Sequence, residues 1–140
     1  MVMLDHPVLL SNQSATERRR VPQRPSASFL FSLAAGVAMV TFSSELASYT
    51  QYYFILSVLV QDSFFMGLAT IFIGALTYLR PNEHTAWSLV MASMGINELV
   101  LVTGTSYTTP LIPVSPMGLV AGILAMISGF LGLIFKPEAY

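Results

Sequence analysis

Three acidic residues stand inside long apolar stretches of this 140-residue chain: Glu45, Asp62 and Glu98. No Lys, Arg or His lies at a comparable depth in those stretches to pair with them. An unpaired charge within a membrane costs about 3 kcal/mol on insertion scales. Each carboxyl group must therefore be protonated, bind a cation, accept hydrogen bonds from neighbours or reach the membrane surface.

Glu98 is the deepest of the three and follows another polar residue, Asn97. It lies about 20 Å along a helix from Thr85, and helical geometry separates it from Gly95 by only about 60°. We therefore expect Glu98 to face a partner helix. Three interpretations stay open for it: a neutral structural group, a bond to another subunit, or a cation or proton site. We expect Glu45 and Asp62 to be solvated near the outer surface.

The composition identifies the class of protein that holds these groups. Hydrophobic residues make up 54% of the chain and charged residues only 9%, whereas soluble domains carry roughly 25% charged residues. The chain is thus predicted to be an integral membrane protein. It has no cysteine, which excludes disulfides and thiolate chemistry, and its net charge of −1 argues against a nucleic-acid partner.

The charges divide the chain into a polar tail and four apolar spans. Eight of the thirteen charged residues lie in the first 25 and last five positions. Residues 1–27 are predicted to be a flexible, basic tail, and residues 28–140 an all-α domain of four transmembrane helices in an up-down bundle. The predicted helices cover about residues 28–48, 53–79, 83–103 and 116–135. The second helix begins near Tyr53, or else residues 49–61 form a separate interfacial segment.

The basic residues predict the orientation of these spans. All six lie in the tail, in the connection between the second and third helices, or at the C-terminus: Arg18, Arg19, Arg20, Arg24, Arg80 and Lys136. With four spans, these positions share one side of the membrane, and the positive-inside rule makes that side cytoplasmic. Both termini are therefore expected in the cytoplasm, with the protein in the plasma membrane.

Small residues recur along the helices at spacings of four and three. The seam in the fourth helix is Gly118, Gly122, Ala125, Gly129 and Gly132, and the second helix carries Gly67 and Gly74 in a similar stripe. A further stripe in the first helix is Ala34, Ala38 and Thr41, leading to Glu45. Small residues let membrane helices approach closely, so we expect the fourth-helix seam, a glycine zipper, to pack inside the bundle or to receive another subunit.

The remaining residues predict no catalytic or cofactor site. His6 lies in the tail and His84 at a helix boundary, which does not make a metal site, and inward-facing haem ligands are missing. No His or Lys base accompanies a serine within the spans. We therefore expect no enzyme activity from this chain alone, no cofactor and no metal.

The second half resembles a known group of membrane proteins. It carries a short basic, proline-containing turn, a Trp-containing helix and a glycine-rich last helix ending in Lys-Pro. The matching positions are Arg80, Pro81, His84, Trp87, Gly118, Gly122, Gly129, Gly132 and Pro137. In these features it resembles small four-helix integral membrane proteins of archaea and actinobacteria whose function is unknown. The resemblance implies the four-helix fold and assigns no reaction.

Two functional hypotheses follow. The first is a non-catalytic subunit that packs against and stabilises a larger membrane complex, such as a respiratory or monooxygenase complex. Its partners would be membrane lipids and other integral membrane subunits, or further copies of itself. The alternative is a small oligomeric transporter or channel that uses Glu98 with Glu45 for a cation or proton, since one chain of four helices hardly encloses a pore.

Overall fold

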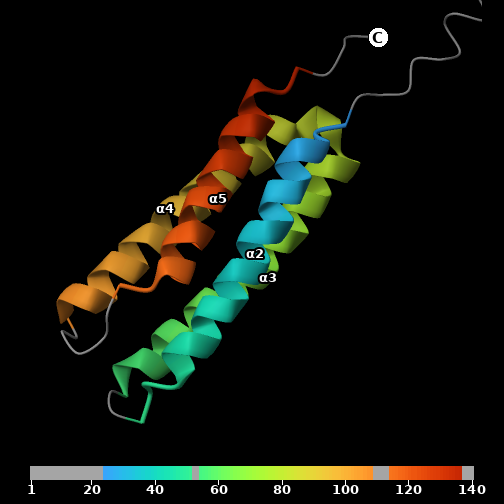
Figure 1. Ribbon diagram of the computed structural model, residues 1–140. Coiled ribbons are helices and arrows are strands. Elements are labelled where there is room, and N and C mark those ends of the chain that lie inside the picture. The colour runs from blue at the N-terminus through green and yellow to red at the C-terminus, as the bar shows by residue number, and fades with distance from the viewer. Residues whose placement is uncertain (1–23, 52–53, 109–113, 137–140) are drawn as a thin grey trace, which may run out of the picture.

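A computed structural model describes residues 24–51, 54–108 and 114–136 of the chain (Figure 1). Within these ranges the chain is all-helical. The long helices are α2 (Ser26–Ala47), α3 (Ile55–Leu79), α4 (His84–Thr108) and α5 (Pro116–Ile134), and the short 3-10 turn η1 (Pro81–Glu83) leads into α4. The predicted tail lies outside the described residues as far as residue 23.

All four long helices are long and apolar enough to cross a membrane. The shortest, α5, has 19 residues, which span about 28 Å at about 1.5 Å per residue. This nearly equals the hydrocarbon thickness of about 30 Å. The chain thus has the helices of a multi-pass membrane protein.

The structure favours one of the two predicted starts of the second helix and moves the end of the third. Helix α3 is continuous from Ile55, so residues 55–61 belong to the span and not to a separate interfacial segment. Helix α4 continues to Thr108, beyond the predicted end at residue 103. The hydroxyl groups of Thr103 and Ser106 donate to carbonyl oxygens one turn back, 2.8 Å to Leu99 and 3.3 Å to Val102. Such bonds satisfy hydroxyl groups inside a helix, which explains why α4 continues through this polar stretch.

Each helix buries a stripe of residues at alternating spacings of four and three. The stripes are Ser28, Ser32, Ala35, Met39, Phe42 and Leu46 in α2; Ser63, Gly67, Thr70, Gly74 and Thr77 in α3; His84, Ser88, Met91, Gly95, Glu98, Val102 and Thr105 in α4; and Gly118, Gly122, Ala125, Gly129 and Gly132 in α5. This spacing is typical of membrane helices that pack along a left-handed seam. We call the α4 stripe the inner seam.

Glycine allows the helix backbones to approach closely at these stripes. A Cβ atom placed on Gly129 of α5 would lie 2.7 Å from the backbone nitrogen of Ala92 in α4. Between α2 and α3 the approach is reciprocal, since a Cβ on Gly67 would lie 2.8 Å from the carbonyl oxygen of Gly36. No side chain fits at either position without moving a helix, which explains why glycine stands there.

The small-residue stripe predicted for the first helix is wrong. Ala34, Thr41 and Glu45 are exposed, and only Ala38 of that set is buried. The contact face lies around Gly36, because Gly36 and Gly67 set the closest approach of α2 and α3. The prediction was based on the spacing of alanine and threonine. It did not consider Gly36, which is buried and adjacent to the buried residue Ala35.

The helices associate as two closely packed pairs. Helix α2 packs along α3, and α4 packs along α5, as Figure 1 shows. The two pairs are joined mainly between α2 and α5, and the contact between α3 and α4 is the least extensive of the four. This arrangement brings the inner seam of α4 toward both α3 and α5.

Candidate functional site

The buried carboxyl group of Glu98 is the centre of the polar interior. Glu98 has no exposed surface, and the hydroxyl of Ser63 on α3 donates to its Oε1 atom at 2.9 Å. Ser63 is also fully buried and lies 3.4 Å from the carbonyl oxygen of Met39 on α2. Three helices therefore meet at this carboxyl group.

The other carboxyl oxygen of Glu98 is buried without a partner. Oε2 makes no hydrogen bond to any residue that the structure describes. Glu98 lies about 15 Å from Thr108, and Ser63 about 12 Å from Ile55, at about 1.5 Å per residue. The pair thus lies well inside the span, where a buried polar atom lacking a partner is costly.

The other predicted intramembrane polar residues do not join Glu98. Asp62 and Asn97 are exposed on α3 and α4. Glu45 lies near the end of α2, where its Oε2 accepts a 2.5 Å hydrogen bond from the hydroxyl of Ser115. Ser115 is the N-cap of α5, because its hydroxyl accepts a hydrogen bond from the N–H of Gly118 at 3.4 Å. Glu45 therefore ties α2 to the start of α5 and is distant in sequence and place from the Glu98 pair.

A second polar cluster joins the start of α2 and the start of α4 to the last part of α5, at the end of the bundle opposite to Glu45. The hydroxyls of Ser28 and Ser128 donate reciprocally to each other's carbonyl oxygens, at 2.8 and 2.7 Å. His84 Nδ1 lies 3.0 Å from the carbonyl oxygen of Gly132. A carbonyl only accepts, so Nδ1 carries the proton and His84 satisfies one of the last free carbonyls of α5. His84 thus fastens α4 to α5.

The basic residues that the structure describes lie at this same end. The guanidinium of Arg24 stacks 5.1 Å from the ring centre of Tyr78 near the end of α3. Arg80 lies 3.9 Å from Glu83 in an exposed ion pair within the turn that joins α3 to α4. Lys136 follows α5 and is exposed. The predicted orientation residues Arg18, Arg19 and Arg20 lie outside the described residues.

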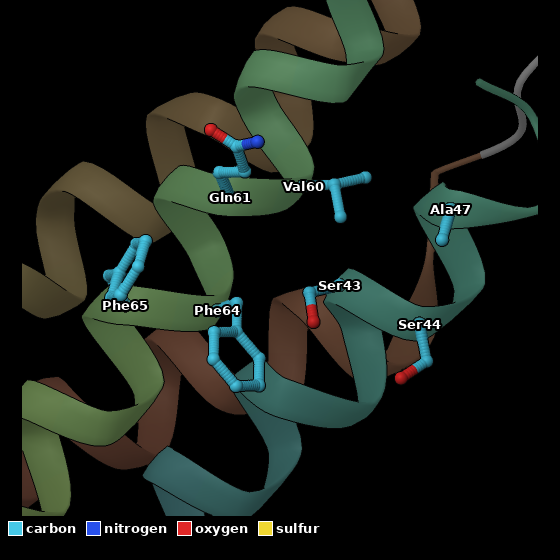
Figure 2. A pocket seen from close by; sticks show the side chains of 7 residues that line it. All are labelled: Ser43, Ser44, Ala47, Val60, Gln61, Phe64 and Phe65. Atoms are coloured by element: carbon cyan, nitrogen blue, oxygen red, sulfur yellow. The ribbon is translucent and has the colours of Figure 1, made fainter.

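A groove of about 490 Å³ opens between the halves of α2 and α3 that are far from this basic end (Figure 2). It is lined by Ser43, Ser44, Ala47, Val60, Gln61, Phe64 and Phe65. The hydroxyls of Ser43 and Ser44 both donate to the carbonyl oxygen of Val40, at 2.7 and 3.1 Å. Because these hydroxyls are already satisfied, the groove presents a mainly apolar wall.

Ser63 is the functional residue that sequence reasoning missed. It lies four residues before Gly67 and so extends the stripe of Gly67, Thr70, Gly74 and Thr77 by one step. The same spacing places Glu98 three residues after Gly95 on the inner seam. Continuing both stripes would have placed Ser63 and Glu98 on the buried faces of their helices, although not opposite each other.

Comparison with known proteins assigns no relative to the chain. No family model, no curated protein and no solved structure matches it. The resemblance to small archaeal and actinobacterial membrane proteins therefore stays a prediction. Among the described residues, no group of three or more His, Cys, Asp or Glu side chains could hold a metal ion.

Proposed function

We propose that this protein is a non-catalytic subunit of a larger assembly in the plasma membrane, an up-down bundle with both termini in the cytoplasm. The observation that carries the proposal is Asn97, a polar amide exposed on the outside of α4. It lies about 20 Å from His84 and about 16 Å from Thr108, so it would meet hydrocarbon in an isolated chain. Polar side chains in such positions drive association between membrane helices.

The inward polar groups support a packing role for the interior. Glu98 with Ser63, Ser28 with Ser128, and His84 with Gly132 each bond one helix to another. These pairs hold the four helices in one arrangement. The outer face of the chain is then left to contact other membrane proteins. Asn97 of α4 and Gln61 of α3 are exposed amides on this face, and Asn97 is the one farther from the end of its helix.

The co-purification experiment tests this proposal. The tagged protein is isolated from its native membrane in mild detergent, and the chains that come with it are identified by mass spectrometry. We expect other integral membrane chains with the wild type and with Phe72→Leu, a change on an exposed part of α3. We expect at least a severalfold loss with Asn97→Leu. Equal recovery with both variants would show that Asn97 holds no partner.

The cytoplasmic orientation is supported by Arg24, Arg80 and Lys136 at one end of the helices, since basic residues favour the cytoplasmic side. A reporter inserted at Asn82 and one fused after Tyr140 should both be active in the cytoplasm. A reporter inserted after Thr109, between α4 and α5, should be external, and this site leaves α4 uninterrupted. Opposite sides for Asn82 and Tyr140 would contradict the up-down bundle.

The alternative function, an oligomeric cation or proton transporter, is favoured by one observation. Oε2 of Glu98 is buried without a partner among the described residues, and ionisable residues inside membranes often mark ion pathways. In this alternative the carboxyl group of Glu98 would carry the proton or cation. It predicts flux through liposomes that contain the purified protein.

A further inference from the structure

Helix α4 carries a second stripe at spacings of four and three, on the side opposite its inner seam. We call it the outer seam: Ala86, Val90, Ser93, Asn97, Val100 and Gly104. The first five residues are exposed. A Cβ added at Gly104 would meet nothing within 4 Å, in contrast to Gly95 on the inner seam. The outer seam therefore has the spacing of a packing face, and its first five side chains are exposed in the part of the chain that the structure describes.

The outward faces of the neighbouring helices differ in composition. Helix α5 exposes Val120, Ile123, Ile127, Phe130 and Ile134, and α3 exposes Phe64, Phe65, Leu68 and Phe72. Such bulky apolar faces suit lipid. The outer seam also exposes Val90 and Val100, but it combines them with the small residues Ala86, Ser93 and Gly104 and with an amide, a composition that allows close contact with another helix.

Asn97 is the exposed amide that lies deepest within the spans, since Gln61 of α3, which also makes no hydrogen bond among the described residues, lies only about 9 Å from Ile55. The hydroxyls of Thr41, Ser44 and Ser93 each donate to a carbonyl oxygen of their own helix. The amide of Asn97 makes no hydrogen bond to any described residue and needs both a donor and an acceptor. A second amide supplies both at once.

We propose that the outer seam of α4 binds the same seam of a second copy of this chain, which makes a parallel, two-fold symmetric dimer. Two copies with the same orientation in the membrane place Asn97 opposite Asn97, and each amide donates to the other. A single Asn in such a seam fixes register and oligomeric state in parallel dimers. The outer seam carries no charged residue that would repel its own copy. This inference rests on the proposed function: the second copy occupies Asn97, and the other chains of the assembly bind the dimer, so they are lost with it in Asn97→Leu.

Disulfide crosslinking tests the dimer directly, because the natural chain has no cysteine. Single-cysteine variants of the full chain are oxidised in native membranes. We expect efficient dimer formation for Ser93→Cys and Val100→Cys, since residues facing across a symmetric seam come within disulfide reach. Thr103→Cys, on the same helix but about 100° from the centre of the outer seam, and Ile127→Cys on α5 should crosslink at least tenfold less.

The amide itself is tested by adding a second substitution to Ser93→Cys. Asn97→Leu should weaken the dimer by about threefold to tenfold, in line with hydrogen bonds between membrane helices, while Asn97→Gln should restore most of the crosslinking. Equal crosslinking of the seam and control variants would overturn the dimer. If other chains then still co-purify through Asn97, the proposed function survives and the occupant is a different subunit. If neither the dimer nor a partner is found, both proposals fail.

Discussion

Gly129→Leu should lower the free energy of unfolding by about 1–3 kcal/mol, the usual cost of overpacking a well-packed core. The first side-chain atom would already lie 2.7 Å from Ala92 N and 2.8 Å from the Ser88 carbonyl oxygen. These are backbone atoms of α4, so the helices must separate. Even Gly129→Ala should be destabilising for this reason. Unfolding in mixed micelles measures both effects.

Two matched variants control this result. Ile123→Leu changes an exposed side chain of α5, so the free energy of unfolding should change little. Gly122→Ala should cost less than Gly129→Ala, because the nearest atoms belong to the flexible side chain of Leu99. Equal stability of Gly129→Leu and Ile123→Leu would mean that α5 does not pack against α4 at Gly129.

Ser63→Ala should destabilise the protein by about 1 kcal/mol, since it leaves both carboxyl oxygens of Glu98 without a hydrogen bond. Glu98→Gln should preserve stability, because its amide oxygen still accepts from Ser63. Glu98→Leu removes the polar contact, which averages only about 0.6 kcal/mol between membrane helices. In the Glu98→Leu background, Ser63→Ala should then cost much less than in the wild type.

The same variants separate the two functional hypotheses. If Glu98 is structural, Glu98→Gln keeps both stability and the associated chains, as does Asp62→Asn on the exposed surface of α3. If Glu98 carries a proton or cation, Glu98→Gln abolishes flux in liposomes while the protein stays folded. Flux in the wild type that disappears in Glu98→Gln would therefore favour the transporter.

The four spans could be predicted because apolar length and charge placement act locally. The 4,3 spacing of small residues likewise predicted the buried stripes of α3 and α5. The face of α2 could not be chosen this way, since Ala34 and Gly36 are both small and only the position of Gly67 decides between them. The sequence could not predict which residues form hydrogen bonds between helices. The bond between Ser63 and Glu98 depends on how α3 and α4 are positioned relative to each other.

The intact mass of the native particle tests the proposal that this chain is part of a larger membrane assembly. The particle is released from native membranes in mild detergent, and its mass is measured without denaturation. We expect a mass well above 15.2 kDa, made up of two copies of this chain together with other membrane chains, and we expect the particle to dissociate in Asn97→Leu. A mass of 15.2 kDa from wild-type membranes would show that the chain is isolated and would rule out both the dimer and the assembly.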